Sequence, residues 1–186
     1  VVPPDQASSD RAEVCPGDGD IVLSYSGGVM PEGGVARWYD DSGLINIIGE
    51  GNALSIPAPV VNSTYYVRFE GDCDTTSAAS ATVTVKSLTV DPVSASVDRS
   101  EVCAGDGNIT LTYAGGDPGS NGVAVWYDGG GFTSSVGTRN NLSLAAPSDT
   151  TTYYVRFEAD CDTSAAVFVE VAVWPTPAPT FGEKYE

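Results

Sequence analysis

Tyr65-Tyr66-Val67-Arg68-Phe69-Glu70 decides the fold, because the same six residues return 88 positions later (153 − 65) as Tyr153-Tyr154-Val155-Arg156-Phe157-Glu158. The same offset relates the other matching segments, which are Val14-Cys15-Pro16-Gly17-Asp18-Gly19 with Val102-Cys103-Ala104-Gly105-Asp106-Gly107, and Trp38-Tyr39-Asp40 with Trp126-Tyr127-Asp128. Without any gap, residues 15–75 share 33 identities over 61 positions with residues 103–163. A constant offset of this kind indicates two copies of one module.

Within each copy, apolar and polar residues alternate in short runs that turn residues interrupt. Ile21, Leu23 and Tyr25 alternate with polar positions, which is the period of a half-buried strand. No window combines helical periodicity with helix caps. The sequence predicts six or seven strands per copy and an all-β sandwich; in the first copy the expected strands include Val35–Asp40, a weaker one at Leu44–Ile48, Leu54–Ile56, Tyr65–Phe69 and Ala81–Val85.

The repeat also sets the expected domain boundaries. We expect the first module at residues 1–88, the second at 89–176, and a proline-rich tail or linker at 177–186. Each copy has a tryptophan in the middle of a strand, Trp38 or Trp126, which is predicted to fill the core between the sheets. The predicted core contains Ile21, Leu23, Trp38, Leu54, Tyr65, Val67, Phe69 and Val83, together with their partners 88 positions on.

The charge and composition argue against several classes of function. The net charge is −17, with 25 acidic and 8 basic residues, so the chain is predicted to repel nucleic acid. No stretch reaches the ~20 apolar residues of a membrane span. The absence of histidine removes the commonest general base and metal ligand, so we expect no enzyme and no cofactor.

These motifs resemble a known family. A Val-Cys-x-Gly-Asp-Gly segment before a Leu-x-Tyr strand, a central Trp-Tyr, and Thr-x-Tyr-Tyr-Val-Arg-Phe-Glu followed by a cysteine resemble the immunoglobulin-like repeats of large secreted Bacteroidetes surface proteins. The resemblance covers nearly all of both copies and implies two tandem immunoglobulin-like β-sandwich domains. It also implies an extracellular or cell-surface location and a role as spacer, adhesin stalk or accessory module, with neighbouring copies of the same module or chain as partners.

Two groups of residues are candidates for ligand and metal binding. Tyr39 and Tyr127, on the strand face opposite the tryptophans, are candidates for contact with glycans, with cross-strand packing as the alternative. The loops with Asp18, Asp20, Asp106 and Asn108 place oxygen ligands two residues apart and are candidates for calcium, with solvated turn carboxylates as the alternative.

The four cysteines, Cys15, Cys73, Cys103 and Cys161, are disulfide candidates because secretion leads into an oxidising space. Pairing within each copy is the simplest arrangement. However, the predicted strand directions place the two cysteines of one copy at opposite ends of its sandwich, beyond the ~7 Å between bonded Cα atoms. The sequence therefore favours a Cys15–Cys161 bond between modules, with Cys73 and Cys103 left to bond neighbouring modules.

The sequence thus supports three functions in decreasing order. The first is a non-catalytic structural module of an extracellular stalk, adhesin or filament. The second is a carbohydrate-binding accessory module of a secreted enzyme, and the third is a fragment of a secreted hydrolase.

Overall fold

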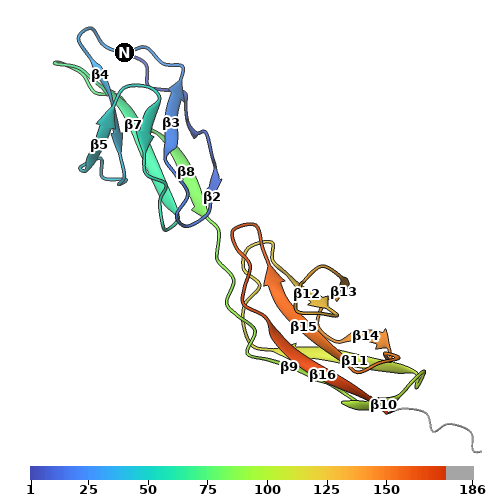
Figure 1. Cartoon of the computed structure of the whole chain (residues 1–186). Coiled ribbons are helices and arrows are strands. Elements are labelled where there is room, and N and C mark those ends of the chain that lie inside the picture. The colour runs from blue at the N-terminus through green and yellow to red at the C-terminus, as the bar shows by residue number, and fades with distance from the viewer. Residues whose placement is uncertain (175–186) are drawn as a thin grey trace, which may run out of the picture. The chain divides into compact units, whose positions relative to one another are not determined.

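The computed structural model describes residues 1–174, and the regular structure of these residues consists of β-strands. The chain divides into two compact units, Val1–Ser87 and Leu88–Glu186, here called unit 1 and unit 2 (Figure 1). The expected proline-rich tail at residues 177–186 lies outside the described residues.

Unit 1 is a sandwich of two sheets. One sheet has three strands in the order β1-β3-β6, and the other has five in the order β2-β8-β7-β4-β5. The strands are β1 (Gln6–Ser9), β2 (Glu13–Val14), β3 (Ile21–Ser26), β4 (Val35–Tyr39), β5 (Ile47–Glu50), β6 (Leu54–Ile56), β7 (Ser63–Glu70) and β8 (Ala79–Val85).

Unit 2 repeats this topology, with a three-stranded sheet in the order β14-β11-β9 and a five-stranded sheet in the order β10-β16-β15-β12-β13. Its strands are β9 (Ser94–Val97), β10 (Glu101–Cys103), β11 (Asn108–Ala114), β12 (Val123–Tyr127), β13 (Ser135–Thr138), β14 (Leu142–Ala145), β15 (Thr151–Glu158) and β16 (Val167–Trp174). The prediction of two tandem all-β sandwiches is confirmed.

Each core lies between the two sheets of its unit and is centred on a tryptophan. Trp38 and Trp126 are fully buried, and their indole N–H groups donate to the carbonyls of Gly51 and Arg139 at 2.9 and 3.0 Å. The hydrogen bond satisfies the one polar group that each indole brings into the core. The predicted core residues are buried, except that Leu54 is partly buried and packs against the core of unit 1.

One predicted strand is displaced. The strand expected at Leu44–Ile48 is instead β5 at Ile47–Glu50, because Asp41 holds the preceding residues in a turn. The Asp41 carbonyl accepts from the N–H of Leu44, its carboxylate accepts from the N–H groups of Ile45 and Asn46, and Leu44 has a φ of 54°. Residues in this turn use the backbone donors that a strand would need.

The first two strands of each unit are further elements that the sequence does not predict. β1 and β2 are short, carry few large apolar residues, and join different sheets, β1 beside β3 and β2 beside β8. Strands of this kind lack the alternating pattern on which the prediction depended.

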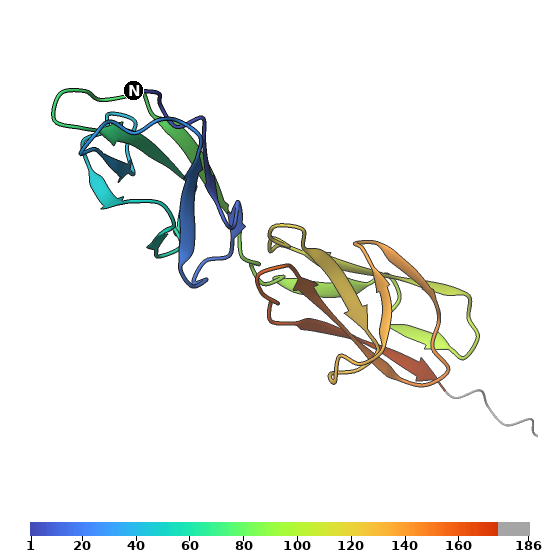
Figure 2. The ribbon, with the colours of Figure 1, turned by 90° about the horizontal axis from the view of Figure 1, so that it is seen from above.

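The short strand β2 in unit 1, and its counterpart β10 in unit 2, determine at which ends the chain enters and leaves each unit. Strand β2 runs parallel to the last strand, β8, with Val14 beside Val85, and β10 runs parallel to β16 with Cys103 beside Trp174. The chain therefore enters a unit at one end of the sheets and leaves it at the opposite end. We call these ends the N-pole and the C-pole, and in both views the strands of unit 1 run from one to the other (Figures 1 and 2).

Because each unit has its own core, we expect two unfolding transitions under reducing conditions. Trp38→Ala should lower the free energy of unfolding of unit 1 by about 3–5 kcal/mol, since it removes a fully buried ring and leaves a cavity. In calorimetry, Trp38→Ala should lower the melting temperature of the unit 1 transition alone, and Trp126→Ala that of the unit 2 transition alone. A common shift of both transitions by either variant would contradict the separation of the cores.

Candidate functional site

The segment that follows β2 forms a tight turn that begins with Cys15. The Asp18 N–H donates to the Cys15 carbonyl at 3.1 Å, and the Cys15 N–H donates to the Asp18 carboxylate at 2.9 Å. Gly17 has a φ of 87°, which the third position of a type II turn requires, and Pro16 suits the second position. We call residues 15–18, and their counterparts 103–106, the cysteine turns.

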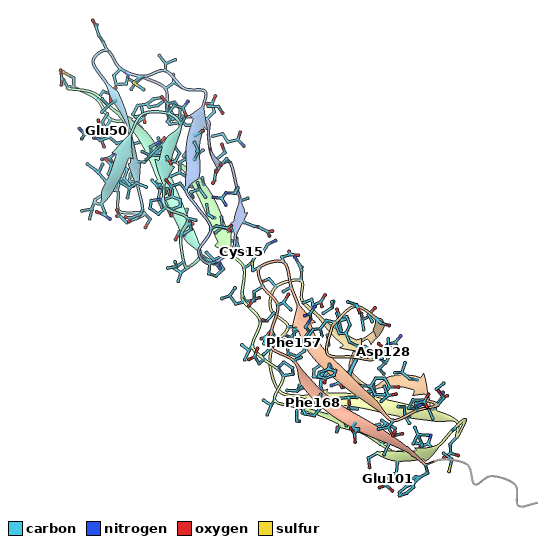
Figure 3. The ribbon with its side chains drawn as sticks, viewed as in Figure 1. Cys15, Glu50, Glu101, Asp128, Phe157 and Phe168 are labelled. Atoms are coloured by element: carbon cyan, nitrogen blue, oxygen red, sulfur yellow. The ribbon has the colours of Figure 1, made fainter. Side chains whose placement is uncertain are left out.

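The second cysteine turn has the same geometry. The Asp106 N–H donates to the Cys103 carbonyl at 3.1 Å, and Gly105 has a φ of 81°. Both turns follow the strand that pairs with the last strand of the unit, so they lie at the C-poles, where Cys15 is seen in Figure 3. The Cys-x-Gly-Asp motif therefore presents a cysteine at the end of each sandwich.

An arginine from outside the motif binds the first turn. Arg11 Nη1 lies 3.2 Å from the Asp18 carboxylate, and Arg11 Nη2 donates to the carbonyls of Gly19 and Asp20 at 2.5 and 2.6 Å. Arg99 does the same in unit 2, with the Asp106 carboxylate at 3.2 Å, the Asp106 carbonyl at 2.9 Å, and the Asn108 carbonyl.

These contacts bear on the candidate calcium ligands Asp18, Asp20, Asp106 and Asn108. Oxygen atoms of the two loops do converge, but on a guanidinium of the same chain. Within residues 1–174, no three His, Cys, Asp or Glu side chains are placed so that they could hold a metal ion. The geometry of the loops is therefore explained by Arg11 and Arg99 without a metal.

The second cysteine of each unit lies in the loop between the last two strands, at the N-pole. In unit 1 the Gly71 N–H donates to the Asp74 carbonyl at 2.8 Å, which places Cys73 at the tip of the turn. In unit 2 the Ala159 N–H donates to the Asp162 carbonyl at 3.0 Å around Cys161. We call residues 71–74 and 159–162 the tip loops.

The state of the cysteines argues against pairing within a copy. Cys15 and Cys161 are disulfide-bonded, whereas Cys73 and Cys103 are exposed free thiols. In unit 1 the seven residues of β8 separate the tip loop from the cysteine turn, a distance of roughly 20 Å. A Cys15–Cys73 or Cys103–Cys161 bond is therefore inconsistent with the sandwich, and the bond between Cys15 and Cys161 stays a prediction.

The outer face of the five-stranded sheet of unit 1 carries a network of charged side chains. Arg68 Nε lies 2.5 Å from Glu70, two residues along the same strand, and Arg37 bridges Glu70 and Glu50 at 2.8 and 2.9 Å. The Tyr39 hydroxyl donates to Glu70, and the Arg68 guanidinium lies 5.1 Å from the centre of the Tyr39 ring. Each group of this network has a partner inside the protein.

Unit 2 replaces part of this network with aromatic side chains. Phe132 packs edge-on against Tyr127 and Tyr154. Tyr154 packs against Phe168, which is 64% exposed and is labelled in Figure 3. Arg156 lies 4.3 Å from the centre of the Phe132 ring. Unit 1 lacks this row of rings, because its counterparts of Phe132 and Phe168 are Leu44 and Ser80.

The candidate ligand contacts Tyr39 and Tyr127 are not exposed. They are only 2% and 6% accessible, and their hydroxyls donate to Glu70 and Glu158. Arg68 and Arg156 lie over their rings. These contacts favour the alternative of packing within the sheet face over direct stacking on a sugar.

Arg11, Arg99 and the row of aromatic rings were missed in the sequence. The two arginines lie 88 positions apart and each precedes its cysteine by four residues, a signal just outside the compared segments. Phe132 and Phe168 differ between the copies, so the repeat draws attention away from them. The sequence has no other signal that Phe132 and Phe168 belong to one row, because Phe132 lies between β12 and β13 and Phe168 lies in β16.

The Tyr127–Glu158–Arg156 contacts predict a pH dependence of stability. The hydrogen bond from Tyr127, together with Arg156, lowers the pKa of Glu158 against the opposing effect of its partial burial. A carboxylate with a lowered folded-state pKa stabilises the fold above its unfolded pKa of ~4.3, and this contribution is lost as the pH falls through the folded value. Glu158→Gln should therefore cost more stability at pH 7 than at pH 3 in urea denaturation.

Glu170→Gln, which changes an exposed glutamate on the neighbouring strand, is the matched control. It should leave the stability nearly unchanged at both pH values. An equal effect of Glu158→Gln at pH 7 and pH 3 would contradict the assignment.

The chain is similar to several solved structures at low sequence identity. No curated protein matches the chain. Among solved structures, extracellular domains 3–5 of Drosophila OTK are 11% identical with a TM-score of 0.46, over 92% of this chain and 61% of that one. The fibronectin(III)-like modules of Clostridium thermocellum CbhA are 15% identical with a TM-score of 0.41, over 91% of this chain and 95% of that one. This chain therefore spans about three fifths of the OTK structure.

The family assignment comes from the sequence of each copy. The model of the CHU_C-associated Ig-like domain matches residues 3–86 and again residues 91–175, one match for each unit. Families of Ig-like domains are typically non-enzymatic modules. The chain belongs to the CHU_C-associated Ig-like domain family and contains two copies of its domain.

Proposed function

We propose that the chain is a non-catalytic structural module of an extracellular stalk, adhesin or filament, with neighbouring copies of the module or chain as its partners. The observation that carries this proposal is the polarity of each unit. A unit has one chain end and one cysteine at its N-pole, and one chain end and one cysteine at its C-pole. Such a unit can be joined to a neighbour at both ends by two covalent connections.

The pairing of the terminal strands suits a module under tension. A pull between the ends of unit 1 draws β2 and β8 in opposite directions along their common axis. The hydrogen bonds between them, such as Thr84 N–H to Ala12 and Lys86 N–H to Val14, both 2.9 Å, are then loaded together. Bonds that share a load must break together, whereas bonds at the end of a hairpin open one at a time.

The charges and the side chains agree with this role. A net charge of −17 keeps such a chain soluble and hinders collapse onto its neighbours. The charged groups on the sheet faces pair with one another. Within residues 1–174, every buried side-chain nitrogen or oxygen has a hydrogen-bond partner, and no helix has the length and apolar character of a membrane span.

A proline in β2 tests the mechanical proposal. Val14→Pro removes a backbone donor facing β8 but keeps a side chain of three carbons. Val14→Ala keeps the donor and removes two buried methyl groups, so it controls for loss of packing at this site. In single-molecule pulling of the reduced chain, we expect the unfolding force of unit 1 to fall at least twofold more in Val14→Pro than in Val14→Ala.

Unit 2 of the same molecules is the internal control, and its unfolding force should stay unchanged. Equal forces for the proline and alanine variants would show that the β2–β8 bonds do not resist tension. Extension of the unmodified units at negligible force would contradict the structural role itself.

A second function is favoured by the aromatic row of unit 2. In this alternative the chain is a carbohydrate-binding accessory module, and the exposed Phe168 with the partly exposed Tyr154 offers the stacking surface that Tyr39 and Tyr127 do not. Aromatic rings suit sugars because they present a flat apolar face.

Phe168→Ser tests this alternative, because serine is the residue at the same place in unit 1. If unit 2 binds glycans, the variant should lose about three- to tenfold in affinity in a glycan array followed by titration. Ser80→Asn, at the matching site of unit 1, should leave binding unchanged. The absence of any bound glycan for the unmodified chain would rule out this function.

A further inference from the structure

The four cysteines fall into two local environments that the repeat makes equivalent. Cys15 and Cys103 begin cysteine turns bound by an arginine, and Cys73 and Cys161 lie at the tips of loops closed by one hydrogen bond. One member of each class, Cys15 and Cys161, is disulfide-bonded, and one member of each, Cys103 and Cys73, is free. The free cysteines thus have the same local geometry as the bonded ones.

We propose that Cys103 of one chain and Cys73 of the next form a disulfide, equivalent to a bond between Cys15 and Cys161 within the chain. This inference rests on the proposed structural function and adds to it a covalent link between copies. In a series of such chains, each cysteine turn would be bonded to the tip loop of the module that follows it.

The free pair is accessible for this reaction. Cys73 lines an open pocket of about 520 Å³ at the N-pole, together with Pro31, Glu32, Asp72 and Asp74. Cys103 ends the edge strand β10 and is exposed at the C-pole. Both thiols can therefore meet a partner without unfolding of their unit.

The bond requires an oxidant, which we take to be a protein or small-molecule disulfide of the extracellular space. The thiolate of Cys103 attacks that disulfide, forms a mixed disulfide and releases one thiol. The thiolate of Cys73 then displaces the second thiol. Two cysteine thiols are oxidised, one disulfide is reduced to two thiols, and the two protons pass to the released sulfurs.

The negative charge at both poles is an argument for a covalent link between copies. The pocket around Cys73 is lined by three carboxylates, from Glu32, Asp72 and Asp74, and Glu101 lies two residues before Cys103. Poles of equal sign repel each other, so electrostatic attraction does not hold them together. A disulfide joins them in spite of the repulsion.

Such bonds would also change the path of tension through the chain. With Cys15 bonded to Cys161, a pull on the two ends passes through residues 1–15, the disulfide, and residues 161–186. The 145 residues between the two cysteines are bypassed and carry no load. Their contour of roughly 490 Å, at ~3.4 Å per residue, is then not available for extension.

Pulling of single chains tests the bypass. When it is unfolded by force, the reduced chain should gain the full contour length of about 490 Å from residues 16–160. The oxidised chain should not gain this length. A full gain from the oxidised chain would overturn the Cys15–Cys161 bond. The unfolding force of the reduced chain tests the structural function separately. A failure of the proposed disulfides can therefore be distinguished from a failure of the proposed function.

The link between copies is tested with two variants that leave one free thiol each. Cys73→Ser keeps Cys103, and Cys103→Ser keeps Cys73; both sites are exposed, so the fold should be retained, which circular dichroism checks. One variant is labelled with ¹⁵N, equal amounts are mixed in a glutathione redox buffer, and mass spectrometry separates the three dimers.

Random oxidation gives homodimers and heterodimer in a ratio of 1:2:1. We expect the heterodimer, linked through Cys103 and Cys73, to exceed either homodimer at least tenfold. Its formation should accelerate when salt is raised from about 0.1 M to 1 M, because salt screens the repulsion between the poles. A statistical mixture, an excess of homodimers, or no dimer at all would overturn the proposal. The Cys73→Ser/Cys103→Ser double variant should stay monomeric.

Discussion

The parallel pairing of the first and last strands of each unit is the constraint on which the other features depend. Because β2 runs beside β8 and β10 beside β16 in the same direction, the chain cannot enter and leave a sandwich at the same end. The same pairing places the cysteine turn next to the end of the last strand and the tip loop next to its beginning. Cysteines that lie 58 residues apart in the sequence, such as 15 and 73, are therefore held at opposite poles.

The few cations of this acidic chain serve its internal structure. Among residues 1–174, six of the seven Lys and Arg residues form ion pairs, and they are Arg11, Arg37, Arg68, Lys86, Arg99 and Arg156. Arg11 and Arg99 order the cysteine turns, while Arg68 and Arg156 cover buried tyrosines. Most basic groups are thus used inside the molecule, and the outer surface is left with an excess of carboxylates.

The two copies share a core and differ on their outer faces, and this difference separates what is required by the fold from what is open to function. Trp38 and Trp126 occupy the same buried site with the same hydrogen bond to a backbone carbonyl. By contrast, Arg37 and Glu50 of unit 1 correspond to Val125 and Thr138 of unit 2, and the aromatic row occurs in unit 2. The core is constrained by packing, since a change of volume there is costly. The sheet face tolerates either an ionic or an aromatic arrangement.

The sequence by itself determined the repeat, the all-β sandwich, the central tryptophans and nearly the whole core, because alternation of apolar residues reports directly which side chains face inward. It also predicted that the cysteines of one copy lie too far apart to bond, since strand direction and rise are set by the backbone.

The tertiary structure decided which partners the charged and polar side chains have, because alternation of apolar residues does not report them. Arg11 and Arg99 bind the acidic loops, Arg68 and Arg156 cover the buried rings of Tyr39 and Tyr127, and Asp41 holds a turn that shifts β5. A side chain's partner on another strand depends on register and on the order of strands in the sheet, which arise only when the two sheets pack together.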